Sequence, residues 1–185
     1  MLKSILSVII ACGLSAGAEL LVNGSFEQPL GTGWVHTEGG AGTHTSNRAV
    51  HYHPDPDYEA MAYQYDNPGW CRLGQTVDVA SPALTLTFWA SFEHSGGTST
   101  CWPAACFSVS YQNRNGTELG ETRYVYSTYA TWQPTPTLSL VRVADPAWSE
   151  YRLDIAREIA DNLPGVSPAD IARIEVALYS YTFDG

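Results

Sequence analysis

The stretch ALTLTFWASF, residues 83–92, carries the clearest fold signal in the sequence. Apolar residues recur at every second position from Leu84 to Phe92, and hydroxyl-bearing residues fill most of the positions between them. Side chains on a β-strand point alternately to the two faces of the sheet, so this period of two predicts a strand with one buried face. We therefore expect Phe88 and Phe92 in a hydrophobic core.

Similar short segments follow one another along the rest of the chain. Residues 107–112 alternate in the same way, and the Asn-Gly type turn of residues 113–116 predicts a hairpin with residues 122–129. The polar, glycine-rich residues 39–46 are expected to form a loop. Further strands are expected at residues 20–22, 49–53, 73–79, 138–143, 151–155 and 174–183.

Helical signals are confined to two short segments. Residues 157–162 are one, and residues 167–173 are the other, where Pro168 suits the first position of a helix. An α/β fold would need longer helices between the strands. The sequence thus predicts an all-β fold, an antiparallel β-sandwich of the jelly-roll type, with at most one or two short helices.

The first 18 residues have the pattern of an export signal. Lys3 supplies the positive charge, residues 5–11 form a short apolar core, and the small residues Ala16 and Ala18 suit cleavage before Glu19. We expect residues 19–185 to form one domain that is secreted, periplasmic or held at the cell surface. Lipidation at Cys12 is an alternative, whereas a membrane span would need about 20 apolar residues.

The charge balance limits the partners that the chain can have. Nine basic residues stand against 19 acidic ones, which gives a formal net charge of −10. A surface of this sign repels nucleic-acid phosphates and anionic lipid headgroups. We therefore expect no nucleic-acid partner and no membrane insertion.

Three cysteines lie beyond the export signal, at positions 71, 101 and 106. An exported chain can hold disulfides, and Cys101 and Cys106 are the nearest pair along the sequence. We predict a Cys101–Cys106 disulfide that leaves Cys71 buried and inert. The alternative pairs Cys71 with either of the other two.

Several segments resemble the motifs of galactose-binding-like jelly-roll domains, a group that includes many carbohydrate-binding modules of secreted bacterial enzymes. The resemblance implies the jelly-roll fold and is weakly specific for function. The segments are LLVNGSFEQPLGTGW (20–34), LGQTVDV (73–79), LTLTFWASF (84–92), AWSEYRLDI (147–155) and IARIEVALYSYTFDG (171–185).

The C-terminus departs from the family pattern. The sequence stops at Asp184-Gly185, where the family continues into a final strand that pairs with the first strand. Two explanations stay open: the sequence is a fragment, with further domains beyond residue 185, or its sheet edge is closed differently.

The same resemblance implies a structural calcium ion where the first and last strands meet. Its ligands would be Glu27, backbone carbonyls around Asn23 and Gly24, and Asp184 near the C-terminus. Carboxylate and carbonyl oxygens are the ligands that calcium prefers. The alternative is that Glu27 caps a turn through backbone N–H groups.

Aromatic residues are the candidates for ligand binding. Trp and Tyr rings can stack on the apolar faces of sugars while polar side chains bind the hydroxyls. Phe26 and Trp34 are expected in the core instead. The predicted glycan-binding residues are Trp70, Trp102, Trp132, Tyr124 and Tyr126.

Other motifs carry weaker signals. His51 and His53 could hold zinc together with His36 or His44, but a solvated loop is the favoured interpretation of residues 51–59. The sequence contains no nucleophile elbow, no His-Glu-x-x-His motif and no phosphate-binding glycine loop.

These observations favour an exported, non-catalytic domain that binds a polysaccharide or glycan. The alternatives are a structural domain of the cell surface or matrix without a small ligand, and the N-terminal module of a truncated, secreted polysaccharide-degrading enzyme.

Overall fold

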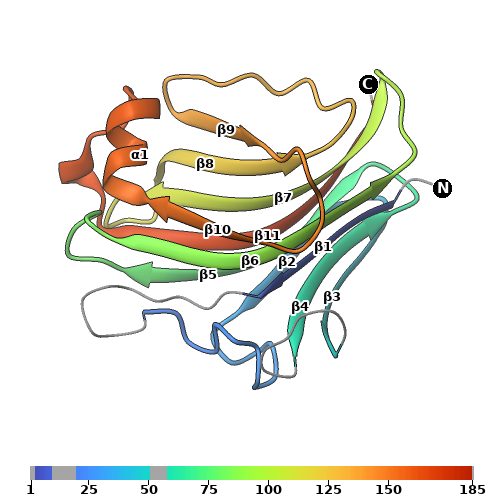
Figure 1. Cartoon of the computed structure of the whole chain (residues 1–185), viewed down its shortest axis with the longest axis horizontal. Coiled ribbons are helices and arrows are strands. Elements are labelled where there is room, and N and C mark those ends of the chain that lie inside the picture. Colours follow the sequence, from blue (N-terminus) through green and yellow to red (C-terminus); the bar gives the residue numbers. More distant parts are fainter. Residues whose placement is uncertain (1–2, 10–19, 51–57, 185) are drawn as a thin grey trace.

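The computed structural model describes residues 3–9, 20–50 and 58–184, and two β-sheets account for most of them (Figure 1). Side chains from both sheets form one hydrophobic core. The predicted all-β sandwich with few, short helices is confirmed.

The five-stranded sheet has the strand order β10-β6-β1-β4-β3, and every neighbouring pair is antiparallel. Most of the stretch ALTLTFWASF lies in strand β6 of this sheet. The strands are β1 (Lys3–Ile9), β3 (Thr43–Ala49), β4 (Glu59–Tyr65), β6 (Thr85–Ser95) and β10 (Ser149–Asp154).

The six-stranded sheet has the order β2-β5-β11-β7-β8-β9. Its pairs are antiparallel except for β8 and β9, which run parallel. The predicted turn joins β7 and β8, where the Gly116 N–H donates to the Asn113 carbonyl at 3.0 Å. The strands are β2 (Val35–Gly40), β5 (Gly69–Asp78), β7 (Cys101–Gln112), β8 (Glu118–Tyr126), β9 (Leu138–Arg142) and β11 (Arg173–Asp184).

Two short helices follow β10, as the sequence predicts. The Asp154 side chain caps α1 (Ile155–Asn162) by accepting from the Arg157 N–H at 3.1 Å, and Ile155 and Ile159 are its buried residues. The 3₁₀ helix η1 (Pro168–Asp170) begins with the proline. Neither described helix is long and apolar enough to cross a membrane.

Aromatic rings from both sheets meet in the core. Phe88 of β6 stacks on Phe107 of β7 with 3.9 Å between ring centroids, and it stacks on Tyr151 of β10 at 5.1 Å. Phe88 and Phe107 have no exposed surface, and Phe92 is 3% exposed. The expected burial of Phe88 and Phe92 is confirmed.

The N-terminal motif of residues 20–34 forms a turn and not a strand, so the strand prediction for residues 20–22 is wrong. The amide side chain of Gln75 replaces a partner strand: it accepts from the Val22 N–H at 2.7 Å and donates to the Val22 carbonyl at 2.8 Å. Asn23 and Phe26 have positive φ angles of 53° and 59°, which turn the chain. Phe26 and Trp34 pack together in the core at 4.9 Å, as predicted.

Residues 39–46 belong mostly to strands β2 and β3, so the loop prediction is wrong for most of them. The chain passes between the two sheets through Gly40, whose φ is +97°. A Cβ atom at Gly40 would lie 2.4 Å from the Gly69 Cα atom, so only glycine allows this close approach. The predicted strand at residues 49–53 falls mostly outside the described residues.

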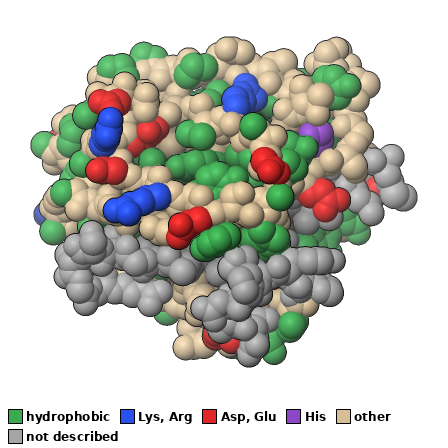
Figure 2. Space-filling view, in the orientation of Figure 1, with side chains coloured by type: hydrophobic (Ala, Val, Ile, Leu, Met, Phe, Trp, Pro, Cys, Tyr) green, Lys and Arg blue, Asp and Glu red, His purple; other side chains and the backbone are tan. Residues whose placement is uncertain are grey.

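Residues 3–9 form strand β1 in the middle of the five-stranded sheet. These residues lie within the predicted export signal, and their removal on export stays a prediction. Figure 2 shows the molecule in the orientation of Figure 1, with acidic and basic side chains near one another at the left and hydrophobic atoms across the middle of the visible face.

Candidate functional site

The six-stranded sheet has one face against the core and a second face turned away from it. On β11 the buried residues Ile174, Val176 and Leu178 take the core face, and the residues between them take the other. We call this second face the outer face. The strand register places on it Trp70 and Arg72 of β5, Trp102 and Ser108 of β7, Glu121 and Arg123 of β8, and Glu175, Tyr179 and Tyr181 of β11.

Five aromatic side chains gather at one end of the outer face. Trp102 is at their centre, with ring centroids 5.2 Å from Trp132, 5.6 Å from Tyr181 and 5.3 Å from Phe183. Trp102 is only 2% exposed, whereas Phe183 is 36% exposed. Tyr179 continues the group at 5.9 Å from Tyr181. These five residues are called the aromatic cluster.

A hollow of about 430 Å³ adjoins the aromatic cluster. Its position follows from a row of small residues across three strands. Ala177 of β11 is paired in register with Gly74 of β5 on one side and with Ser108 of β7 on the other. Because these residues lack bulky side chains, the surrounding side chains stand higher than the sheet between them. We call this space the polar hollow, and it is lined by Thr37, Trp70, Arg72, Glu118, Glu121, Arg123, Glu175 and Tyr179.

Two ion pairs fix the charged groups of the polar hollow. Arg123 donates to both carboxylate oxygens of Glu121, at 2.9 and 2.6 Å. Arg72 Nε lies 3.1 Å from Glu175 Oε1. Burial alone would lower the pKa of the Arg123 guanidinium, but the hydrogen bonds and charge of Glu121 outweigh it and raise that pKa. Arg123 therefore stays charged.

Arg123 also joins the polar hollow to the aromatic cluster. Its guanidinium carbon lies 4.5 Å from the ring centroid of Trp132 and 5.4 Å from that of Tyr179. A guanidinium over an aromatic ring at these distances is a cation–π contact. The two parts thus form one continuous surface.

Trp70 also lines the polar hollow, and it lies opposite Tyr181 of β11 on one side and Gly39 of β2 on the other. A Cβ atom at Gly39 would lie 2.6 Å from the indole nitrogen of Trp70. Because Gly39 has no side chain, the indole of Trp70 can pack closely against strand β2. Trp70 is partly exposed, so a ligand can reach it.

Some polar atoms under this surface lack a hydrogen-bond partner within the described part of the chain. They include Ser108 Oγ and Arg72 Nη2, which are both buried. Buried polar atoms in proteins are nearly always hydrogen-bonded.

The structure brings the three predicted tryptophans to the outer face but not the two predicted tyrosines. Tyr124 and Tyr126 lie on the opposite face of β8, so their assignment to the ligand site is corrected. Tyr124 is 6% exposed, with its ring edge against Phe88, and burial raises its pKa to about 12. Tyr126 packs against the core and lies 4.8 Å from the ring of His94.

Sequence reasoning missed the contribution of the last strand. Tyr179, Tyr181 and Phe183 alternate with the buried residues Ser180 and Thr182 along β11. This alternation is visible in the sequence, but small polar residues take the core face, so it does not stand out as a hydrophobic pattern. The arginines and glutamates of the polar hollow form no sequence motif.

The predicted calcium ligands make contacts within the protein. Glu27 Oε1 accepts from the Tyr58 N–H at 3.1 Å, and the Glu27 carbonyl accepts from Arg48 at 2.9 Å. Asn23 Oδ1 accepts from the Gln28 N–H at 2.8 Å, and Gly24 is buried in the same turn. Asp184 ends β11 opposite Cys101. Calcium binding stays a prediction.

The predicted disulfide between Cys101 and Cys106 is wrong. Both cysteines lie on strand β7, where five residues of separation put them on opposite faces and about 17 Å apart. A disulfide needs Cα atoms within about 7 Å. Cys71, Cys101 and Cys106 are all free thiols, and burial raises the pKa of the Cys106 thiol.

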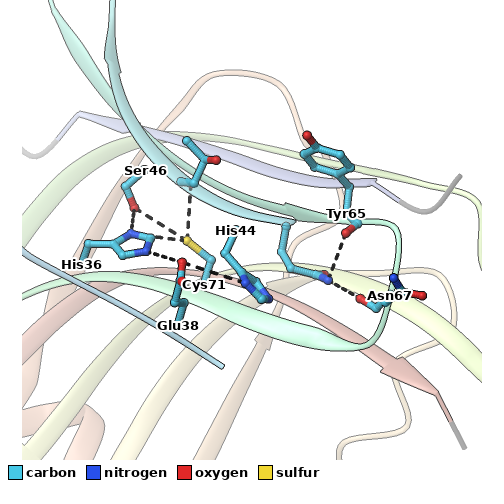
Figure 3. A network of polar contacts seen from close by, with 9 residues as sticks. His36, Glu38, His44, Ser46, Tyr65, Asn67 and Cys71 are labelled. Carbon is cyan, nitrogen blue, oxygen red and sulfur yellow. Dashed lines mark hydrogen bonds and ion pairs between the residues drawn. The ribbon is translucent and has the colours of Figure 1, made fainter. Parts of the chain in front are cut away.

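A second polar group lies where β2, β3 and β5 meet (Figure 3). His36 Nδ1 lies 2.6 Å from Ser46 Oγ and 3.8 Å from Cys71 Sγ, and His36 Nε2 lies 2.8 Å from Glu38 Oε2. The hydrogen bond with His36 lowers the pKa of Glu38, whereas burial raises the pKa of Cys71. A buried thiol whose pKa is raised is a poor nucleophile.

His44 completes this group, with Nδ1 3.9 Å from Glu38 Oε2. The suggested zinc site needs His51 and His53, which lie outside the described residues. Across the ranges that the structure describes, no three His, Cys, Asp or Glu side chains are grouped so that they could hold a metal ion.

No protein-family profile and no curated protein sequence matches the chain. Solved structures do resemble it. The family 11 carbohydrate-binding module of a cellulosomal cellulase from Clostridium thermocellum is 13% identical, with 94% of this chain and 93% of that chain covered and a TM-score of 0.44. The family 11 module in complex with a β-1,3-1,4-mixed-linked tetrasaccharide is 12% identical, with 96% and 93% covered and a TM-score of 0.43.

The enzymatically active domain of tailspike protein 4 from bacteriophage CBA120 also resembles the chain. It is 11% identical, with a TM-score of 0.49 over 91% of this chain, which spans only 19% of the tailspike chain. The likeness of this protein to family 11 carbohydrate-binding modules is one of β-sandwich fold at low sequence identity.

Proposed function

We propose that this protein binds a glycan on the outer face of the six-stranded sheet and that it does so without catalysis. The observation that supports the proposal is the continuity of the aromatic cluster with the polar hollow on one rigid sheet. The expected leader at residues 1–18 would bring this surface outside the cytoplasm, where polysaccharides are found.

The chemistry of the surface suits a sugar. A pyranose has apolar faces that stack on indole and phenol rings, and hydroxyls that both donate and accept hydrogen bonds. Trp70 and the exposed edge of the aromatic cluster offer ring surfaces beside the polar hollow. Between them, the arginine–glutamate pairs offer donors and acceptors held in place by each other.

Packing alone explains part of the aromatic cluster but not the whole surface. Trp102 is nearly inaccessible, so its main role is to fill space under Trp132 and Tyr181. Trp70 lies outside that cluster, is partly exposed, and lines a hollow with charged residues. A ring that served only to cover the sheet would not need charged residues around it.

Binding without hydrolysis is favoured by the state of the carboxylates. A glycosidase needs one carboxyl group as a proton donor and a second as base or nucleophile. Glu121 accepts two hydrogen bonds from Arg123, and Glu175 is held by Arg72 and by the Gln112 amide at 3.0 Å. Glu118 accepts from the Ser110 hydroxyl at 2.8 Å.

Affinity electrophoresis of the full chain tests the proposal. The gels would contain mixed-linkage β-glucan, xylan, mannan, pectin or no polysaccharide. We expect at least one polysaccharide to slow the wild-type protein, and Trp70→Ala to weaken that binding about tenfold, which corresponds to the loss of one stacking contact.

The matched control is Trp89→Ala, because Trp89 is a partly exposed tryptophan on the other sheet. It should migrate like the wild type in every gel. Equal losses in the two variants would contradict the proposed surface. If no polysaccharide slowed the wild type, the structural role at a cell surface or matrix would be favoured instead.

A further inference from the structure

Strand β1 fills a slot between two strands that do not pair with each other. Lys3–Ile9 runs antiparallel to β4 on one side and to β6 on the other. Adjacent strands lie about 4.8 Å apart, so without β1 the facing edges of β4 and β6 would stand about 10 Å apart. That gap is too wide for direct hydrogen bonds, and each edge would present unpaired N–H and C=O groups.

Strand β1, which fills the slot, also covers part of the hydrophobic core. Position 6 of β1 lies opposite Ala62 of β4 and Phe92 of β6, and position 8 lies opposite Ala60 and Ala90. These four residues are between 0% and 3% exposed with β1 in place. Loss of the strand would bring their apolar surface into contact with water, which is unfavourable.

The residues that fill the slot are those that the sequence predicts to be removed on export. Cleavage after Ala18 would separate Lys3–Ile9 from the rest of the chain. The exported chain would then keep β4 and β6 but would lack the strand that joins them. A five-stranded sheet would become two strand pairs, β10-β6 and β4-β3.

We propose that, in the exported protein, this slot accepts an extended apolar segment of a partner polypeptide, which completes the sheet by strand addition. The partner segment runs antiparallel to both neighbours and starts at the end where β4 finishes at Tyr65 and β6 finishes at Ser95. It has apolar residues at the two alternate positions that face Ala62 and Ala60. The site is separate from the outer face of the six-stranded sheet, so it does not depend on glycan binding.

Strand exchange in the whole chain tests this proposal. A site-specific protease sequence placed within residues 10–19 allows the folded chain to be cut, so that no residue of β1 is lost. The cut chain is then unfolded in urea and refolded with an excess of a fluorescent peptide of residues 2–10. The unfolding step ensures that a tightly held strand cannot block exchange.

We expect the cut chain to refold with the labelled peptide bound, so that fluorescence anisotropy rises to saturation. A peptide carrying Leu6→Asp places a carboxylate opposite Ala62 and Phe92, and it should bind at least about tenfold more weakly. A peptide carrying Ile5→Thr is the matched control, because position 5 lies opposite the partly exposed Tyr63 and the exposed Glu93. It should bind nearly as well as the wild-type peptide.

Three results of the refolding experiment would overturn the proposal. The first is that the chain refolds equally well after the cut segment has been removed and no peptide has been added. The second is failure to refold even with the wild-type peptide, and the third is equal binding of the wild-type and Leu6→Asp peptides.

N-terminal sequencing of the exported protein is an independent test. A chain that still began at Met1 would keep its own strand in the slot and would need no partner.

Discussion

The outward faces of the two sheets each carry a pair of tyrosines two residues apart, yet their surroundings differ. Tyr179 and Tyr181 of β11 have ring centroids 5.9 Å apart, and Tyr63 and Tyr65 of β4 have theirs 5.8 Å apart. Trp132 lies 5.3 Å from Tyr181, and Arg123 lies over Tyr179.

On the five-stranded sheet, the tyrosine pair lies between β1 and β3, and β3 places Thr45 opposite Tyr63 and Thr43 opposite Tyr65. The outward positions of β6 on the same sheet hold Thr85, Thr87, Trp89, Ser91 and Glu93. We therefore expect that a tyrosine pair does not make a binding surface by itself. The neighbouring strands decide whether rings and charges gather around it.

The largest expected effect is on stability, and it concerns the centre of the aromatic cluster. Trp102→Ala removes a ring that is 2% exposed, so we expect the free energy of unfolding to fall by about 3–5 kcal/mol. Trp70→Ala should cost much less, because Trp70 is partly exposed. Urea denaturation of both variants measures the difference, and equal losses would mean that the two rings do not have the separate roles described here.

An intermediate effect is expected from the ion pair that links the polar hollow to the aromatic cluster. Glu121→Gln leaves the Arg123 guanidinium without its carboxylate in a place where only 15% of that side chain is exposed. We expect a loss of about 2 kcal/mol of unfolding free energy, as for a hydrogen bond to a charged group.

The control for this variant is Asp161→Asn, which breaks the exposed pair between Arg157 and Asp161 on α1. Exposed pairs contribute about 0–1 kcal/mol, so the unfolding midpoint should hardly change. Urea midpoints that shift equally for the two variants would contradict a rigid, ion-paired polar hollow.

The smallest effect should be seen on the five-stranded sheet, as a change with pH. Burial lowers the pKa of His94 from its ordinary value of 6.5. The folded state therefore binds this proton less readily than the unfolded state, and the stability that neutral His94 contributes is present above pH 6.5 and is lost as the pH falls below it.

We expect the melting temperature of the wild type to fall more steeply than that of His94→Gln between pH 7 and pH 5. Differential scanning fluorimetry at a series of pH values measures both slopes. Parallel slopes would show that the protonation of His94 does not affect folding.

Strands with a regular hydrophobic pattern could be predicted from the sequence. Residues 83–92 and 107–112 alternate because one face of β6 and of β7 packs in the core. β2 and β3 gave no such signal, since β2 is largely exposed, β3 is mostly half-buried, and neither has a fully buried face. β2 pairs with β5, which is about 30 residues away along the sequence, and β3 pairs with β4, the next strand.

The candidate site could be predicted only in part, because the choice of face depends on pairing. Trp70, Trp102 and Trp132 were identified by residue type alone. Tyr124 and Tyr126 were assigned to the wrong face of β8, since a period of two gives the alternation of a strand but not which side is buried. Arg72 and Glu175 are 103 positions apart, so no local motif could reveal that ion pair.

The most direct test of the central claim is the glycan affinity of two double variants. Tyr179→Ala/Tyr181→Ala alters the outer face of the six-stranded sheet, and Tyr63→Ala/Tyr65→Ala alters the matched pair on the other sheet. Isothermal titration would use the polysaccharide that slows the wild type most, after circular dichroism has shown that both variants are folded. We predict at least about tenfold weaker binding for the first variant and wild-type affinity for the second. Wild-type affinity in the first, or an equal loss in both, would contradict the assignment of glycan binding to the outer face.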